Sequence, residues 1–284
     1  MNPFCSISQM LIKKLVMLKI NFQKGFKIRN AYLFLEAIKR INNWYLYFLE
    51  YFSLVPRKYI RLEMRDGKTF ILRTGTVDRG VITSVLLADE YDIRNLQLPK
   101  SATVVDIGAN IGVFSILVSS KAGRVFSYEP VKENFELLRK NIGLNALSRR
   151  ITPFNLAVTE NSADTVKIFL SGYNQAGHSI YGRGNRHEEA RSTTLQEILD
   201  SNSIEICDFL KIDAEGAEYE ILYSLPARYF KRIKIVFFEY HDKYCSGYIK
   251  GYKNYNRKDL KAYLEKQGYR VKVILDCLRA ETSE

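Results

Sequence analysis

A short apolar run, followed by an acid and two spaced glycines, most constrains what this chain can fold into. Residues 104–112 read VVDIGANIG, and apolar residues at helical spacing follow them. A buried strand, a tight glycine turn and a helix, in that order, form the nucleotide-binding corner of an open α/β sheet. Glycine at Gly108 and Gly112 permits backbone angles that other residues resist. The segment therefore predicts a strand over 102–107 and a helix over 111–121.

An acid after the next predicted strand, 124–128, supports this interpretation. Glu129 lies 21 residues after Gly108 and precedes Pro130. An acid at that distance accepts hydrogen bonds from the hydroxyls of a ribose. The two motifs together predict an adenosine-containing cofactor.

The spacing of the glycines distinguishes between cofactors. Nicotinamide and flavin sites usually carry G-x-G-x-x-G, whereas this chain carries D-x-G-x-x-x-G beginning at Asp106. A carboxylate near the loop repels a pyrophosphate but suits the ammonium of an amino-acid-bearing cofactor, which points to S-adenosylmethionine. The alternative is an ordinary tight turn that binds no ligand.

Five segments give the chain a resemblance to a known family. They are VVDIGANIGVFSI (104–116), YEPVKENFELLRKNI (128–142), NLAVTE (155–160), DFLKIDAEGAEYEIL (208–222) and VFFEYHD (236–242). From about residue 56 to 275 the chain resembles the FkbM family of S-adenosylmethionine-dependent methyltransferases. The resemblance implies a class I methyltransferase fold and methyl transfer to an oxygen, often on a sugar or a secondary metabolite. The acceptor does not carry over, because members of this family differ widely in substrate.

The order of predicted elements supports the same fold class. Predicted strands are 102–107, 124–128, 151–157, 165–170, 207–212, 233–239 and 269–275, and predicted helices are 111–121, 131–142, 193–200, 216–224 and 257–267. Regular alternation predicts an α/β class I methyltransferase (Rossmann-like) fold, with a mainly parallel seven-stranded sheet and helices on both faces. An N-terminal helical segment and a β-hairpin precede it.

The chain divides at Pro56 in this interpretation. Residues 1–55 form a basic, aromatic-rich helical segment, and residues 56–284 form the methyltransferase domain. Within that domain, residues 56–100 supply a hairpin and a lid, and residues 101–275 form the cofactor-binding core. The hairpin strands are 59–64 and 69–73, and a helix over 78–91 follows. Asp78 and Glu90 on that helix are candidate lid residues.

The predicted cofactor-binding residues all follow carboxyl ends of strands, where ligands of such sheets bind. Gly108, Ala109, Asn110 and Gly112 form the loop under the methionine end, and Asp106 orients that loop or the ammonium. Glu129 and Pro130 meet the ribose, Ala157 and Val158 meet the adenine, and Asp213 faces the methyl donor. For Ala157 and Val158, simple core packing is an equal alternative.

The predicted catalytic residues are Asp213, Glu215, Glu239 and His241. An alcohol must lose its proton as the carbon–oxygen bond forms, and each of these side chains is a candidate general base. Glu215 is also explained as an acid at a helix start, and a lone histidine is often structural. His178, in a glycine-rich basic loop over 171–192, is a further candidate base. No ligand spacing demands a metal, so we predict none.

Charge and cysteine usage narrow the class of partner. The chain has 284 residues and a net charge of +12, and residues 1–61 contain eleven Lys or Arg against two Asp or Glu. The catalytic domain is therefore nearly neutral, which argues against nucleic acid and favours a small-molecule or glycan acceptor. Four scattered cysteines without a C-x-x-C pair fit a reducing, cytoplasmic setting. The oligomeric state is left open.

Residues 8–52 combine basic and aromatic residues at helical spacing, including a dense patch from Trp44. This composition suits a membrane surface, which would make the protein peripheral on the inner face of the membrane. The alternative is that these helices cap the core or form a dimer contact. Apolar runs are shorter than the ~18 residues of a spanning helix.

Two other functions stay open. One is an RNA or protein methyltransferase, although the Asn/Asp-Pro-Pro-Tyr/Phe motif of many amino-group methylators is missing. The other is a catalytically inactive module that still binds the cofactor. The run of acids in 213–218 argues against the second.

Overall fold

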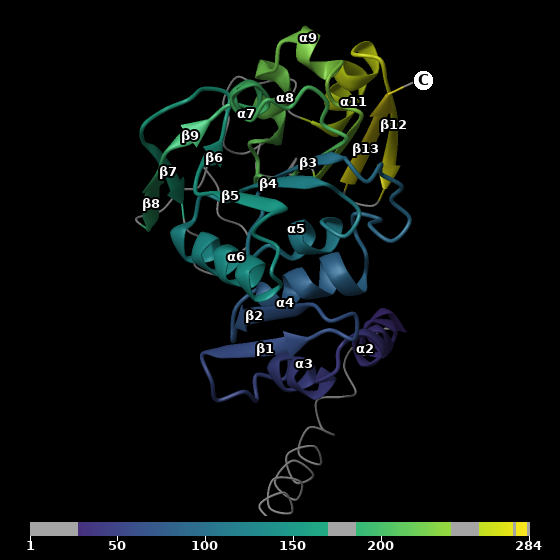
Figure 1. The fold of residues 1–284 in the computed structure, drawn as a ribbon, viewed down its shortest axis with the longest axis vertical. Helices are drawn as coiled ribbons and strands as arrows, with labels where there is room; N and C mark the ends of the chain where they lie inside the picture. The colour runs from purple at the N-terminus through teal and green to yellow at the C-terminus, as the bar shows by residue number, and fades with distance from the viewer. Residues whose placement is uncertain (1–27, 170–185, 240–255, 275–276, 283–284) are drawn as a thin grey trace, which may run out of the picture.

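A computed structural model of the chain describes residues 28–169, 186–239, 256–274 and 277–282 (Figure 1). Its main sheet has seven strands in the order β12-β13-β11-β10-β3-β4-β5. Their bounds are β3 (Thr103–Ile107), β4 (Arg124–Tyr128), β5 (Ile151–Phe154), β10 (Phe209–Ile212), β11 (Ile235–Glu239), β12 (Tyr269–Ile274) and β13 (Cys277–Thr282). Strands β11 to β5 run parallel, and β13 is antiparallel to both of its neighbours. The predicted mainly parallel sheet is confirmed.

One predicted member of that sheet is wrong. The segment predicted as strand 165–170 forms β7 (Val166–Phe169), which pairs with β8 (His187–Ala190) in a separate two-stranded sheet. The seventh strand is instead β13, which the sequence interpretation missed. Only one of the four residues of β7 is buried, whereas three of the six residues of β13 are buried. A strand of a sheet that helices cover must be buried in this way, so β13 suits the main sheet better than β7 does. The predicted strand 151–157 is divided between β5 and β6 (Ala157–Val158), and β6 pairs with β9 (Ser192–Thr193).

Helices cover both faces of the sheet, and strand alternation divides the core between them. In β3, Val104 belongs to one apolar cluster while Val105 and Ile107 belong to the other. The first cluster includes residues of α5 (Val113–Val118), α6 (Lys132–Leu144) and η1 (Ile82–Leu87). The second includes residues of α7 (Leu195–Ser201), α8 (Glu218–Ser224), α9 (Ala227–Phe230) and α11 (Arg257–Lys266).

The N-terminal unit consists of α2 (Ile28–Arg40), α3 (Trp44–Tyr51) and the hairpin β1 (Tyr59–Glu63) and β2 (Thr69–Arg73). It lies at the lower end of the view in Figure 1 and continues the first apolar cluster. Between it and the sheet, the predicted helix 78–91 is divided into α4 (Asp78–Val81) and η1, which is π-helical. None of the helices in the described ranges is long and apolar enough to cross a membrane.

Asn141 of α6 and Asn145, the residue after that helix, hold the hairpin to the core. The Asn141 side chain accepts from the backbone N–H of Ile71 at 2.7 Å and donates to the Ile111 carbonyl at 2.9 Å. One turn later, Asn145 accepts from Thr69 N–H at 2.9 Å and donates to its carbonyl at 2.7 Å. These amides satisfy the backbone groups on the open edge of β2, so the hairpin is fixed next to the glycine loop.

Candidate active site

The glycine loop after β3 is packed too tightly for any side chain at its first glycine. Gly108 has φ +75°, and a Cβ there would lie 1.8 Å from the carbonyl oxygen of Asp213. The backbone N–H groups of Gly108 and Ala109 both donate to the Tyr128 carbonyl at 2.9 Å. Asn110 is also left-handed, with φ +50°. The loop is therefore wedged between the ends of β4 and β10.

Glu129 is buried beside that loop with one face toward the cavity. Its Oε2 accepts the Asn110 backbone N–H at 2.9 Å, and its Oε1 accepts that of Val131 at 2.9 Å and the Asn134 amide at 3.4 Å. A carboxylate offers about four acceptor positions, so capacity is left for a ligand hydroxyl. Burial, opposed in part by these hydrogen bonds, raises the pKa of Glu129 to about 7.

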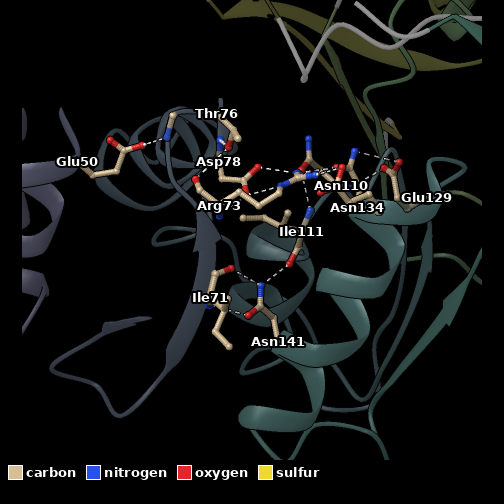
Figure 2. Close-up of polar contacts among 12 residues, drawn as sticks. Glu50, Ile71, Arg73, Thr76, Asp78, Asn110, Ile111, Glu129, Asn134 and Asn141 are labelled. Atoms are coloured by element: carbon tan, nitrogen blue, oxygen red, sulfur yellow. Dashed lines mark hydrogen bonds and ion pairs between the residues drawn. The ribbon is translucent and has the colours of Figure 1, made fainter. Parts of the chain in front are cut away.

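A chain of polar contacts connects Glu129 to the hairpin (Figure 2). The Arg73 guanidinium donates through Nε and Nη2 to Asp78 at 2.9 and 2.8 Å, and its Nη2 also donates to Asn134 Oδ1 at 2.7 Å. Asn134 in turn donates to Glu129. Asp78 is fully buried. Asp78 therefore anchors Arg73 in the protein interior, and its role as a lid residue stays a prediction.

Lys211 of β10 connects the glycine loop to Asp213, the acid that follows β10. Its Nζ donates to Asp106 Oδ1 at 3.0 Å and to the carbonyl of Gly108 at 2.8 Å, and it lies 3.8 Å from Asp213 Oδ2. Burial by itself lowers the pKa of Lys211, but the charges of Asp106 and Asp213 outweigh it and the pKa is raised. The ammonium is thus a fixed cation in the floor of the site.

Asp106 and Gly112 lie behind the cavity wall. Asp106 is fully buried, where it accepts from Ser115 Oγ at 2.5 Å and pairs with Lys211. Gly112 has φ +89°, and a Cβ there would lie 2.5 Å from Leu138 Cδ1. Asp106 therefore orients the loop through Lys211, and Gly112 lets helix α6 approach closely.

Asp213 lies at the end of β10 and receives a hydrogen bond from Tyr91 Oη at 3.3 Å. Burial first, and Asp213 second, raise the pKa of Tyr91 well above its usual value, so the phenol stays protonated and donates. Its ring is held between Phe114 and Phe237, with centroids 5.1 and 5.2 Å away. Sequence reasoning missed both Tyr91 and Lys211 as site residues, because contacts 122 and 105 residues apart leave no local signal.

The acids after Asp213 divide into a cavity residue and a structural one. Helix α8 begins at Glu218, so Glu215 does not start a helix but lies in the loop, with φ +49°. Glu218 is fully buried and accepts the backbone N–H groups of Ala214 and Gly216 at 2.9 Å each. Its carboxylate fixes the loop that presents Glu215 to the cavity.

These groups enclose a cavity of about 450 Å³, within the usual range of ligand sites. Among the described residues of its wall, the acids are Glu90, Glu129, Asp213, Glu215 and Glu239, and the only Lys or Arg is Lys211. An apolar section consists of Tyr128, Pro130, Leu156, Ala157, Val158 and Ile168. The candidate bases His241 and His178 lie outside the described residues. No group of three His, Cys, Asp or Glu in the described ranges is arranged to hold a metal.

The chain matches one known protein family over the segment that supplies most of this cavity. The family described as the methyltransferase FkbM domain matches residues 106–271. The chain belongs to the FkbM methyltransferase family. The matched range contains the glycine loop, Glu129, Asp213 and Glu239, and it confirms the resemblance seen in the sequence.

Three curated relatives are distant in sequence. The chain is 25% identical over 200 residues to the AMB antimetabolite synthetase AmbE of Pseudomonas aeruginosa, covering 57% of this chain and 9% of that protein. It is 26% identical over 183 residues to the methyltransferase sdnD of Sordaria araneosa, covering 52% and 69%. It is 26% identical over 140 residues to the hexuronic acid methyltransferase AglP of Haloferax volcanii, covering 48% and 56%. The chain thus spans less than two thirds of AmbE and of AglP.

A solved FkbM methyltransferase, from Methylobacillus flagellatus, is 17% identical with a TM-score of 0.42, and the match covers 72% of this chain and 53% of that one. The cofactor of the FkbM family is the predicted S-adenosylmethionine. The cavity fits it in three respects. The Gly108 backbone lines the cavity, Glu129 keeps acceptor capacity beside that loop, and an apolar section is present for a flat ring.

Proposed function

We propose that this FkbM protein is an S-adenosylmethionine-dependent O-methyltransferase that methylates a hydroxyl of a sugar, glycan, glycolipid or secondary metabolite. One observation carries the proposal. The glycine loop and Glu129, which suit the cofactor, share a single cavity with Asp213, Glu215 and Glu239, which suit an acceptor hydroxyl. Cofactor recognition and proton acceptance are thus available side by side.

Bound S-adenosylmethionine supplies an electrophilic methyl group on a sulfonium. In the proposed mechanism, Asp213 accepts the hydrogen bond of the acceptor hydroxyl and takes its proton as the oxygen attacks. Tyr91 and Lys211 hold Asp213 in place. Displacement at a methyl carbon requires donor and acceptor in line, so the rigid floor contributes through alignment. Glu215 and Glu239 orient the acceptor.

The charge of the wall supports a polyhydroxy acceptor over RNA. Five carboxylates against one buried ammonium, among the described wall residues, repel a phosphate backbone but accept hydrogen bonds from hydroxyl groups. The printed name of one relative, a hexuronic acid methyltransferase, also points to a sugar-derived acceptor.

Titration calorimetry with S-adenosylmethionine and S-adenosylhomocysteine tests the cofactor half of the proposal. We expect micromolar binding that weakens on Glu129→Ala. Binding should be unchanged on Glu136→Ala, since Glu136 is an exposed acid on α6, the helix that follows Glu129. Mass spectrometry of neutral sugars, uronic acids and an oligoribonucleotide incubated with the enzyme and cofactor then tests the acceptor class. Cofactor binding with methylation of the oligoribonucleotide alone would reject the O-methylation of small molecules.

A further inference from the structure

Exposed large hydrophobic side chains are concentrated at one end of the molecule. Ten such side chains are exposed in the described ranges, and six of them belong to α2 and α3, which have only 13 and 8 residues. They are Tyr32, Leu35, Ile38, Trp44, Tyr45 and Tyr51, with exposed fractions from 36% to 56%. We call these six the N-terminal patch. Scattered single apolar residues are normal on a protein surface, but this density is not.

Helix α2 has two apolar faces, and only one of them is covered. Phe34, Ala37 and the following Ile41 are buried against the core. Tyr32 and Leu35 are exposed by 50% and 56% on the opposite side. Since one apolar stripe is enough to anchor a surface helix, the second is available for another partner.

Aromatic contacts fix the two helices in one orientation. Phe34 of α2 stacks on Phe48 of α3 at 4.3 Å and meets Tyr51 edge-on at 5.1 Å. Trp44 contacts Phe48 edge-on at 5.4 Å. The exposed rings of the patch therefore extend from a packed aromatic layer.

The turn between the helices is attached to the hairpin. Asn43 donates to the Arg61 carbonyl at 2.8 Å and accepts from Glu63 N–H at 3.0 Å. Asn42 N–H donates to the Glu63 carbonyl at 2.7 Å. The patch is consequently rigid before any partner binds, which lowers the entropic cost of docking.

The surroundings of the patch are basic. Residues 28–61 contain six Lys or Arg against two acids. Both acids, Glu36 and Glu50, are buried, and Glu36 pairs with Lys39 and Arg40. The Lys39 side chain is 68% exposed beside Leu35 and Ile38 in the helix. The patch thus presents aromatic rings and cations together, with its acids turned inward.

We propose that the N-terminal patch rests on the surface of an anionic lipid bilayer. Tyr and Trp favour the interface between water and hydrocarbon, because one end of each side chain is apolar and the other is polar. Lysine extends its stem along the apolar region and leaves its ammonium among anionic headgroups. A second protein copy is a poorer occupant, because lysine is depleted at protein interfaces.

Trp44 makes the proposal directly measurable, since it is the single tryptophan of the chain. The full-length protein is titrated with vesicles of phosphatidylcholine, with and without phosphatidylglycerol. We expect a blue shift of Trp44 emission and quenching by brominated lipids only with the anionic vesicles. The shift should weaken in high salt, which screens the cations. Unchanged emission with sedimenting protein would mean that another segment binds the vesicles, and it would overturn the proposal.

Serine variants that keep Trp44 separate the patch from general surface effects. The double variant Leu35→Ser/Tyr45→Ser should lower vesicle partitioning by about tenfold, because two apolar contacts are removed. The matched control is Val273→Ser, which is 53% exposed on β12, as Tyr45 is on α3. Equal partitioning of the double variant and the control would reject the patch as the lipid contact. A concentration-dependent doubling of mass without vesicles, lost in the double variant, would instead assign the patch to a second copy.

Discussion

Two buried ion pairs flank the cavity, and they lead to different parts of it. In the sheet, Lys211 and Asp106 are 3% and 0% exposed, and Lys211 continues to the glycine loop and Asp213. In the hairpin region, Arg73 and Asp78 are 4% and 0% exposed, and Arg73 continues through Asn134 to Glu129. The same interaction therefore supports the proposed chemistry on one side and cofactor recognition on the other.

The largest expected effect concerns Asp213, which lies beside the Lys211–Asp106 pair of the sheet. Asp213→Asn should lower turnover by roughly 10²–10⁴-fold, because the amide cannot take the acceptor proton. Affinity for S-adenosylhomocysteine, measured by calorimetry, should stay within a factor of about three, since the isosteric side chain keeps the Tyr91 contact. Turnover equal to that of the wild type would remove Asp213 from the mechanism.

Breaking the sheet pair should cost stability. Lys211→Met leaves Asp106 buried without its cation, and the free energy of unfolding should fall by about 3–5 kcal/mol in urea denaturation. The double variant Lys211→Met/Asp106→Leu should recover much of that loss, because no charge is left buried alone. If the double variant is no more stable than Lys211→Met, the loss of stability does not come from the unpaired charge of Asp106.

A hairpin variant should change affinity rather than turnover. Arg73→Lys keeps a cation beside Asp78 but loses the second donor to Asn134, which orients the amide toward Glu129. We expect the Kd for S-adenosylhomocysteine to rise roughly tenfold with kcat nearly unchanged. Arg61→Lys, on the exposed side of the same hairpin, is the control. A fall in kcat with unchanged affinity would contradict the division between the two pairs.

Cofactor affinity should depend on pH through Glu129. Its pKa is raised to about 7, and donation by ribose hydroxyls favours the ionised form, so binding releases a proton below that pH. The Kd for S-adenosylhomocysteine should rise by up to about tenfold per pH unit below 7 and stay flat above about 8. Calorimetry from pH 5.5 to 8.5 measures this dependence. Glu129→Gln should show weaker binding with no such slope.

The smallest expected effect concerns an ion pair on the protein surface, which serves as a comparison for the two buried pairs. Lys261 and Glu265 on α11 form an ion pair at 3.7 Å with side chains 40% and 48% exposed. Lys261→Met should change the free energy of unfolding by less than about 0.5 kcal/mol. A change as large as that of Lys211→Met would mean that burial does not set the importance of these pairs.

Much of the site was readable from local sequence. Gly108, Asn110, Glu129, Asp213, Glu215 and Glu239 all line the cavity, because each lies at or just after the carboxyl end of a strand. Their roles as binding or catalytic residues remain predictions. The helix predicted over 78–91 is present, but it ends at Leu87 and is π-helical from Ile82. Strand β13 was missed because its mixed polarity gives little periodicity.

What the sequence determined by itself is the alternation of core strands and helices, the family, and the acids at the strand ends, since these depend on residues close together in the chain. Only the tertiary structure decided that Lys211 pairs with Asp106, that Arg73 reaches Glu129 through Asn134, and which aromatic residues of α2 and α3 face outward. Those contacts join segments tens to more than a hundred residues apart. Periodicity shows that a helix has an apolar face, but the neighbour that covers this face exists only once the chain has folded.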